Sequence, residues 1–224
     1  MNLLSIIGNP YKLLSAVTAA LSFSSTSQAR ILADTAALST SRTSQAGNTL
    51  YYDPYGAKDG PHILQVPDDL NIAPAFVEFN EGRLAQKNLA EIQSVLAKNP
   101  SAGVVVTFLG ALNSDQAELR NILRDTPKRE KLASDIANFV NQNPYEGAKI
   151  AEVDIDYEFP SNLEDAKHYL AFLMNIKGFL NKTPLTFALP PKNGLGYFAA
   201  PSVKVNGTSF ADFLTNPDVS ATWF

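Results

Sequence analysis

The sequence predicts an α/β protein built around a parallel sheet, and two features support this class. Short β-prone runs alternate along the chain with longer segments whose apolar residues recur at helical spacing. The run from residue 103 to 110 is apolar almost throughout, which is typical of a parallel strand covered on both faces. This alternation implies right-handed crossovers between parallel strands. A barrel and an open doubly wound sheet both fit the pattern.

Five segments are predicted as strands, because each is short and rich in β-branched, aromatic or other apolar residues. In chain order they span 49–52, 72–79, 103–110, 150–159 and 184–190. Pro74 limits the start of the second strand, since proline cannot donate a ladder hydrogen bond. No glycine-rich phosphate loop follows any of these strands, so the fingerprint of a dinucleotide-binding fold is missing from the sequence.

Three segments are predicted as helices from the spacing of their apolar residues. They span 82–98, a stretch that includes 132–140, and 163–180. In the second of them, Leu132, Ile136 and Val140 lie at positions i, i+4 and i+8 and so share one helical face. Asn99 and Pro100 end the first helix. Each helix is placed to connect two parallel strands.

The composition excludes several classes of function. The chain has 224 residues and a formal net charge of −4, which argues against nucleic acid as a partner because phosphate binding needs clustered Lys and Arg. The absence of Cys removes disulfides, thiolate nucleophiles and Cys-based zinc sites. The two histidines, His62 and His168, are far apart in sequence, so a His-rich metal site is not expected. At 45% hydrophobic residues, the chain can bury a substantial core.

The amino-terminal segment differs from the rest of the chain. In residues 1–29 the only charged side chain is Lys12, which precedes an apolar and small-residue run and the small residues Ser27 and Ala29. This pattern predicts a secretory signal peptide, hence a secreted, extracellular protein that does not stay in the membrane after cleavage. An amphipathic or disordered segment is the alternative. Residues 30–47, rich in Ser, Thr and Ala, are predicted to form a flexible leader.

A row of carboxylates marks the candidate site. Because alternate side chains of a strand face opposite ways, Asp154, Asp156 and Glu158 are predicted to share one face, at spacings of about 6–7 Å. Val153, Ile155, Tyr157 and Phe159 then share the face that packs against helices. Burial and mutual repulsion are expected to raise at least one carboxyl pKa, as a general acid requires. A solvated strand face and a divalent metal site remain the alternatives.

These residues resemble a known signature. The run from Val153 to Pro160 is similar to the motif of family 18 glycoside hydrolases, the chitinase family, which reads Asp-Gly-x-Asp-x-Asp-x-Glu. Asp154, Asp156 and Glu158 match its last three acidic positions, whereas its opening Asp-Gly is replaced by Ala151-Glu152. A second family motif, Ser-x-Gly-Gly, is matched in part by residues 107–110. The resemblance covers about residues 48–190.

The resemblance implies a hydrolase of β-1,4-linked N-acetylglucosamine polymers (chitin) that works by substrate-assisted, retaining catalysis. By analogy with the family, Glu158 is the general acid, Asp156 orients the substrate acetamide and Asp154 adjusts the pKa of Asp156. No metal or organic cofactor is implied. The partner is chitin or an oligosaccharide that contains N-acetylglucosamine.

Further side chains are candidates for substrate binding. Aromatic rings stack on the apolar faces of sugars, which favours Tyr52 and Tyr157. Gly110 matches the retained glycine of the second motif. Tyr197 is the nearest candidate in sequence for the family's acetamide-binding Tyr, whose Met-x-Tyr-Asp context is missing. Core packing is the alternative for each aromatic residue.

The length indicates how much of a barrel to expect. Removal of residues 1–29 from the 224-residue chain leaves 195, short of the roughly 250 typical of an eight-stranded (β/α) barrel. We therefore expect residues 48–224 to form a partial catalytic barrel of TIM type, with five or six of the eight βα units. The alternative is a catalytically inactive, chitinase-like carbohydrate-binding protein or a gene fragment.

Overall fold

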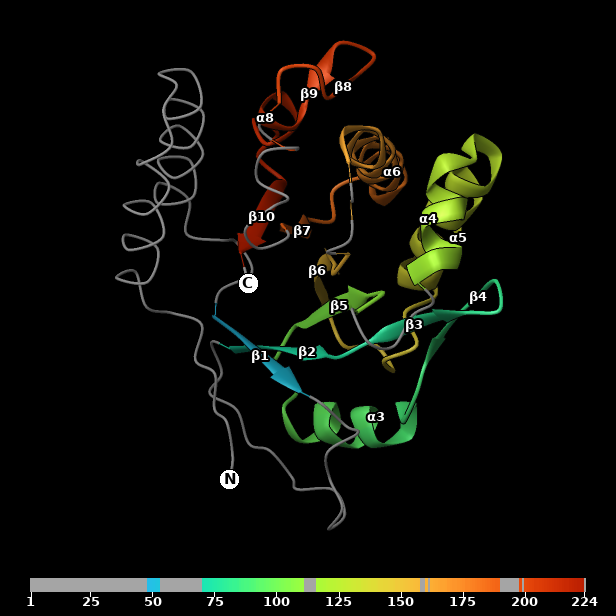
Figure 1. Cartoon of the computed structure of the whole chain (residues 1–224). Coiled ribbons are helices and arrows are strands. Elements are labelled where there is room, and N and C mark those ends of the chain that lie inside the picture. Colours follow the sequence, from blue (N-terminus) through green and yellow to red (C-terminus); the bar gives the residue numbers. More distant parts are fainter. Residues whose placement is uncertain are drawn as a thin grey trace, which may run out of the picture.

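A curved parallel sheet forms the centre of the computed structural model, which describes residues 48–52, 70–110, 116–157, 160, 162–189, 198 and 200–223. Within these residues the sheet has eight strands, and six of them form a continuous parallel path (Figure 1). They are β1 (Asn48–Tyr52), β2 (Leu70–Pro74), β5 (Val104–Phe108), β6 (Ile150–Ile155), β7 (Leu185–Leu189) and β10 (Val219–Trp223).

The order of the strands distinguishes a barrel from a doubly wound sheet. Each strand pairs with the next one along the chain, from β1 through β2, β5, β6 and β7 to β10. A doubly wound sheet would reverse its strand order at a switch point, whereas a barrel keeps one direction throughout. The fold is therefore an incomplete TIM-type barrel, and the expected α/β class and partial barrel are confirmed.

The second predicted strand is interrupted, and the predicted helix 82–98 begins later than expected. β2 ends at Pro74, and β3 (Val77–Asn80) resumes the pairing with β5. β4 (Arg83–Gln86) then returns antiparallel to β3, so the prediction of helix at 83–86 is wrong. The turn consists of Glu81 and Gly82, both with positive φ, which is the geometry of a tight two-residue hairpin.

Helices occupy the crossovers, as Figure 1 shows for α3, α4, α5 and α6 around the outside of the sheet. Their bounds are α3 (Leu89–Lys98), α4 (Gln116–Arg124), α5 (Thr126–Gln142) and α6 (Leu163–Leu180). α6 begins and ends at the predicted residues. At its amino-terminal end, the Asn162 side chain caps the first turn by accepting a hydrogen bond from the Asp165 amide. The sequence analysis did not predict α4, which is short and strongly polar on its outer face.

The segment after β7 also contains elements that were not predicted. A small hairpin pairs β8 (Lys204–Val205) with β9 (Thr208–Ser209), and α8 (Phe210–Phe213) follows. α8 begins in a capping box, in which Ser209 and Asp212 each satisfy a backbone amide of the other. β10 then pairs with β7 over its whole length and adds the sixth parallel strand.

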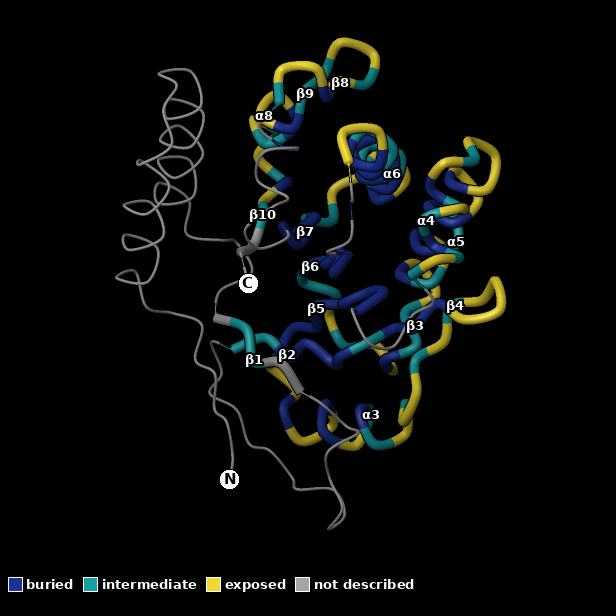
Figure 2. The backbone as a smooth tube through the Cα atoms, in the orientation of Figure 1, coloured by how far each residue is buried: buried dark blue, intermediate teal, exposed yellow. Residues whose placement is uncertain are grey.

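The core lies between the sheet and the helices that surround it. Figure 2 shows buried residues along the central strands and on the helix sides that face them, and exposed residues on the outer turns. Aromatic rings fill the part of the core beside α6, where Tyr169 packs against Tyr157, Phe187, Phe198 and Phe210. This packing holds β6, β7, α6 and α8 together at the end of the sheet where the carboxylates lie.

The predicted signal peptide (1–29) and leader (30–47) lie outside the described residues. In the part of the chain that the structure describes, no helix is both long and apolar enough to cross a membrane.

Candidate active site

The acidic strand β6 divides its side chains between two faces. Val153 and Ile155 are fully buried in the core with α6, and the Tyr169 hydroxyl donates to the Ile155 carbonyl at 3.3 Å. Asp154 therefore points away from α6, toward the inside of the curved sheet. Pairing continues past the strand end, because the Asp156 amide donates to the Phe108 carbonyl at 3.0 Å. Asp154 and Asp156 are both buried.

Polar side chains flank Asp154 on the neighbouring strands. The register places Thr107 of β5 on one side of Asp154 and Thr186 of β7 on the other. Ser220 of β10 is opposite Thr186, and their hydroxyl oxygens are 3.1 Å apart. Because residues opposite each other in a sheet share a face, these four side chains form one inward layer. Sequence reasoning missed Thr186 and Ser220, since only the strand register connects them to the acidic motif.

Glu152 is a further carboxyl on this face. Glu152 lies two residues before Asp154, so the alternation of a strand is the sequence signal that puts both on one face. Its register partner is Val105 of β5. A bulge precedes it: Val104 pairs with Ile150 and Val105 with Glu152, so Ala151 is an extra residue in β6. Glu152 is only 7% exposed, and burial raises its pKa to about 7. Glu152 therefore adds a carboxyl with a raised pKa next to the predicted carboxylate row.

Gly110 follows β5 at the carboxyl end of the sheet. Its φ is +61°, and a Cβ at this position would lie 2.8 Å from the Phe76 ring. Glycine is therefore required there on two grounds, the left-handed backbone and the close approach of the ring. Two residues earlier, Phe108 accepts the Asp156 amide, so Gly110 and the carboxylates lie at the same end of β5 and β6.

The structure describes only some of the other predicted site residues. Tyr157 is buried on the face opposite Asp154 and Asp156, with its ring 5.2 Å from that of Tyr169. Tyr52 is the last residue of β1 and pairs with Pro74 in the sheet. Its side chain is not among those that the structure describes. Glu158 and Tyr197 also lie outside the described residues.

Among the described residues, no group of three or more His, Cys, Asp or Glu side chains is arranged to hold a metal ion.

The fold and the site together define a class. The parallel sheet keeps one strand order, and buried carboxylates lie on its inner face at the carboxyl ends of the strands. These features define a (β/α)-barrel protein with an acidic site at the end of the barrel where barrel enzymes have theirs. The chain belongs to the glycosyl hydrolases of family 18, whose family model matches residues 48–213.

Three relatives illustrate the similarity. The protein named Secreted chitinase LysM12 from Penicillium expansum is 34% identical over 38% of this chain. The class V chitinase from Nicotiana tobaccum has a TM-score of 0.57 at 15% identity over 80% of this chain, and a mutant of it has been solved in complex with NAG4. A chitinase from Rhizomucor miehei has a TM-score of 0.57 at 19% identity over 78% of this chain.

The chain spans about half the length of these solved structures, 51% of the Nicotiana protein and 55% of the Rhizomucor protein. The matched part is 6% of the Penicillium protein. At these identities the solved structures establish the shared fold.

Proposed function

We propose that the chain binds and hydrolyses β-1,4-linked N-acetylglucosamine polymers at the carboxyl ends of its strands. The observation that carries the proposal is the burial of Asp154 in β6 and of Asp156 just after the strand, two residues before Glu158 in the sequence. Membership of family 18 supports the class of reaction, and the NAG4 complex of the Nicotiana relative supports the class of ligand.

In the proposed mechanism, Glu158 acts as the general acid and gives its proton to the glycosidic oxygen. The acetamide oxygen of the substrate attacks the anomeric carbon as the glycosidic bond breaks, which forms an oxazolinium ion. Asp156 orients the acetamide and stabilises its positive charge, and Asp154 adjusts the pKa of Asp156. Water then opens the oxazolinium ion and returns a proton to Glu158, so the anomeric configuration is retained.

The environment of Asp154 fits this role. The register places the polar residues Thr107 and Thr186 on the two strands beside this buried carboxyl. The Thr107 hydroxyl is buried and, among the described residues, makes no hydrogen bond. This layer is polar, whereas barrel interiors are usually filled with branched apolar side chains.

The test is hydrolysis of a fluorogenic chitobioside by the purified chain and by Glu158→Gln. We expect turnover by the wild-type chain and a loss of about 100-fold or more in Glu158→Gln, because general acid catalysis contributes on this scale. Glu164→Gln is the matched control, since Glu164 lies on the exposed side of α6 and pairs with Lys167. Equal rates for wild type and Glu158→Gln would contradict the general acid. Chitin binding without turnover would instead identify a carbohydrate-binding protein.

We also propose that the chain is exported. The support is the predicted signal peptide and the relative from Penicillium expansum that is named a secreted chitinase. Expression of the full chain in a secreting host, followed by amino-terminal sequencing of the protein in the medium, tests this. A mature protein that starts at Arg30 is expected, and retention of the intact chain in the cell would contradict export.

A further inference from the structure

The last residue of β4, Gln86, links the β3–β4 hairpin to the turn between α5 and β6. The Tyr145 hydroxyl donates to Gln86 Oε1 at 2.9 Å, and Gln86 Nε2 donates to the Phe76 carbonyl at 3.3 Å. Gln86 pairs with Val77 of β3, and Val77 is fully buried in the core. Because paired residues share a face, Gln86 lies on the core side of the hairpin.

Tyr145 is a fixed donor for this glutamine. It is only 1% exposed, and its ring lies edge-on to that of Phe139 in α5, with 6.5 Å between the centroids. The carbonyl of the preceding residue, Pro144, accepts a hydrogen bond from Gln93 of α3 at 2.8 Å. Burial raises the pKa of the Tyr145 phenol, so the hydroxyl keeps its proton and can donate.

The contacts of Gln86 fix the orientation of its side-chain amide. The Phe76 carbonyl can only accept a hydrogen bond, so the donor Nε2 must face it, and Oε1 is then turned toward the Tyr145 hydroxyl. A glutamate at this position would have almost the same shape. It would still accept from Tyr145, but it would place a second acceptor against the Phe76 carbonyl.

The main chain that Gln86 contacts also contacts the end of β5. The Val77 carbonyl accepts the Leu109 amide at 3.0 Å. The Phe76 ring lies so close to Gly110 that a Cβ there would be 2.8 Å from it. Phe76 and Val77 therefore determine where the two residues after β5 lie.

The end of β5 in turn holds the acidic motif, because the Phe108 carbonyl accepts the Asp156 amide at 3.0 Å. We propose that Gln86 is a positioning residue: held by Tyr145, it fixes the main chain against which β5 ends, and so keeps Gly110 and Asp156 in place. The inference rests on the proposed function, in which Asp156 orients the substrate acetamide. A displacement of about 1 Å at such a group is sufficient to lower turnover about 100-fold.

Three variants separate the two hydrogen bonds of Gln86. Gln86→Met removes both and keeps the length of the side chain. Gln86→Glu keeps the acceptor for Tyr145 and removes the donor to Phe76. Tyr145→Phe removes the hydroxyl and keeps the ring against Phe139. If Gln86 only joined β4 to Tyr145, Gln86→Glu would behave as the wild type, whereas the proposal expects it to behave as Gln86→Met.

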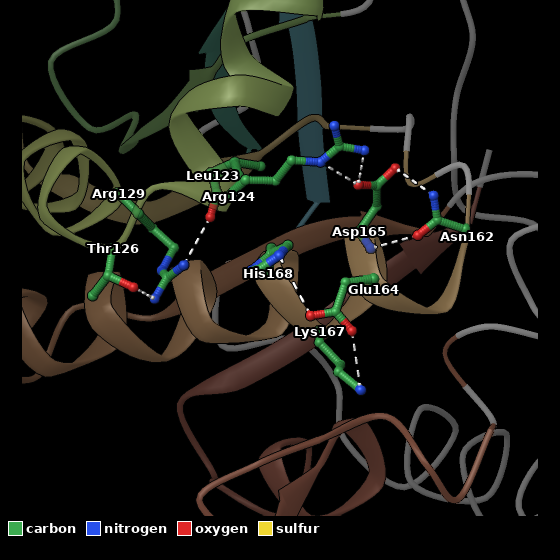
Figure 3. Close-up of polar contacts among 9 residues, drawn as sticks. All are labelled: Leu123, Arg124, Thr126, Arg129, Asn162, Glu164, Asp165, Lys167 and His168. Atoms are coloured by element: carbon green, nitrogen blue, oxygen red, sulfur yellow. Dashed lines mark hydrogen bonds and ion pairs between the residues drawn. The ribbon is translucent and has the colours of Figure 1, made fainter.

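An ion pair between α4 and α6 supplies the control. Figure 3 shows Arg124 of α4 and Asn162 converging on Asp165 in the first turn of α6. Arg124 donates from Nε and Nη2 to Asp165 Oδ1 at 3.0 and 2.8 Å, and the Asp165 side chain is only 3% exposed. Arg124→Gln therefore removes a partner of a buried carboxylate, which should lower the melting temperature and leave the contacts of β3 with β5 intact.

The first measurement is steady-state hydrolysis of the chitobioside. We expect Gln86→Met and Gln86→Glu each to lower kcat by about tenfold, with KM changed by less than about threefold. Tyr145→Phe should lower kcat in the wild-type background and have no further effect in Gln86→Met, since it acts through Gln86. Arg124→Gln should change kcat by less than about threefold. Wild-type kcat in Gln86→Glu, or an equal loss in Arg124→Gln, would overturn the positioning role.

The second measurement, amide hydrogen exchange, does not depend on activity. The amides of Leu109 and Asp156 should exchange about tenfold faster in Gln86→Met and Gln86→Glu than in the wild type. The Val153 amide is the internal control, because it donates to the Pro184 carbonyl on the other side of β6 at 2.9 Å and should keep its wild-type rate. Equal acceleration at Val153 would show general loosening and overturn the positioning role.

The two measurements together distinguish this inference from the proposed function. An inactive wild-type chain that shows the expected exchange pattern would overturn the proposed hydrolysis and support the positioning of Asp156. An active chain whose kcat and exchange rates are unchanged by Gln86→Met would overturn the positioning role alone.

Discussion

Glu152 and Asp154 lie two residues apart on the inward face of β6, and both carboxyls are buried. Their surroundings differ, because Glu152 is opposite Val105, whereas Asp154 is opposite Thr107 and Thr186. Burial without a charged partner raises the pKa of Glu152 to about 7. The strand thus carries a carboxyl that holds its proton near neutral pH directly below the acidic residues of the proposed site.

Glu152→Gln should change how the stability of the chain depends on pH. In the unfolded chain the Glu152 pKa is 4.5, and in the folded chain it is about 7. Between these values the folded state holds a proton that the unfolded state has lost, so stability falls as pH rises. The total loss is about 3 kcal/mol by pH 8.

The measurement is urea unfolding between pH 4 and pH 8. The free energy of unfolding of Glu152→Gln should fall less over this range than that of the wild type and exceed it at pH 8. Glu164→Gln, on the exposed side of α6, is the control and should follow the wild-type curve. The same pH dependence in Glu152→Gln and wild type would contradict the raised pKa.

Asp156→Asn should lower the turnover of the chitobioside by about 100-fold, because an amide cannot stabilise the positive charge that develops on the acetamide. The melting temperature reports separately on folding. Asp135→Asn provides the control, since Asp135 pairs with Lys131 on the surface of α5. Wild-type kcat in Asp156→Asn would contradict the role proposed for Asp156.

Gly110→Ala should destabilise the chain by about 1–3 kcal/mol, because the new methyl group meets the Phe76 ring at a residue with positive φ. Gly178→Ala gives the opposite expectation. Gly178 lies inside α6, and a Cβ there meets nothing within 4 Å, so alanine should stabilise the helix by about 0.5–1 kcal/mol. Urea unfolding measures both changes, and effects of the same sign would contradict this account of Gly110.

Asn162→Ala should reduce stability by about 1 kcal/mol, because the Asp165 amide at the start of α6 loses the side chain that caps it at 2.9 Å. Asn162→Ser is the matched control, since serine is also a favourable capping residue. The serine variant should recover part of the loss, because it keeps the cap but lacks the hydrogen bond from Asn162 Nδ2 to Asp165 Oδ2. Equal losses in the two variants would show that capping is not the role of Asn162.

Local signals explain which elements the sequence predicted well. The helix 163–180 was predicted at both ends, and its buried face, which includes Leu170 and Leu173, follows the helical period. The hairpin of β3 and β4 was missed because its turn begins with Glu81, a residue that seldom adopts positive φ. α4 was missed because only Leu119 and Leu123 of it are buried, too few to give a strong period.

The carboxylate row shows most clearly what the sequence alone could predict. The alternation of a strand was enough to predict that Asp154 and Asp156 share a face and that Val153 and Ile155 pack on the other, since this depends only on neighbouring residues. The alternation of strands and helices likewise determined the α/β class. The residue count and the family resemblance supplied the expectation of a partial barrel.

Only the tertiary structure decided the rest, because it depends on how strands far apart in the chain are aligned. The register brings Thr107, Thr186 and Ser220 into the layer of Asp154, and a one-residue shift would have turned them to the other face. The strand order selected a barrel over a doubly wound sheet. Packing of α4 against α6 brought Arg124 to Asp165, an ion pair between two helices that no local pattern specifies.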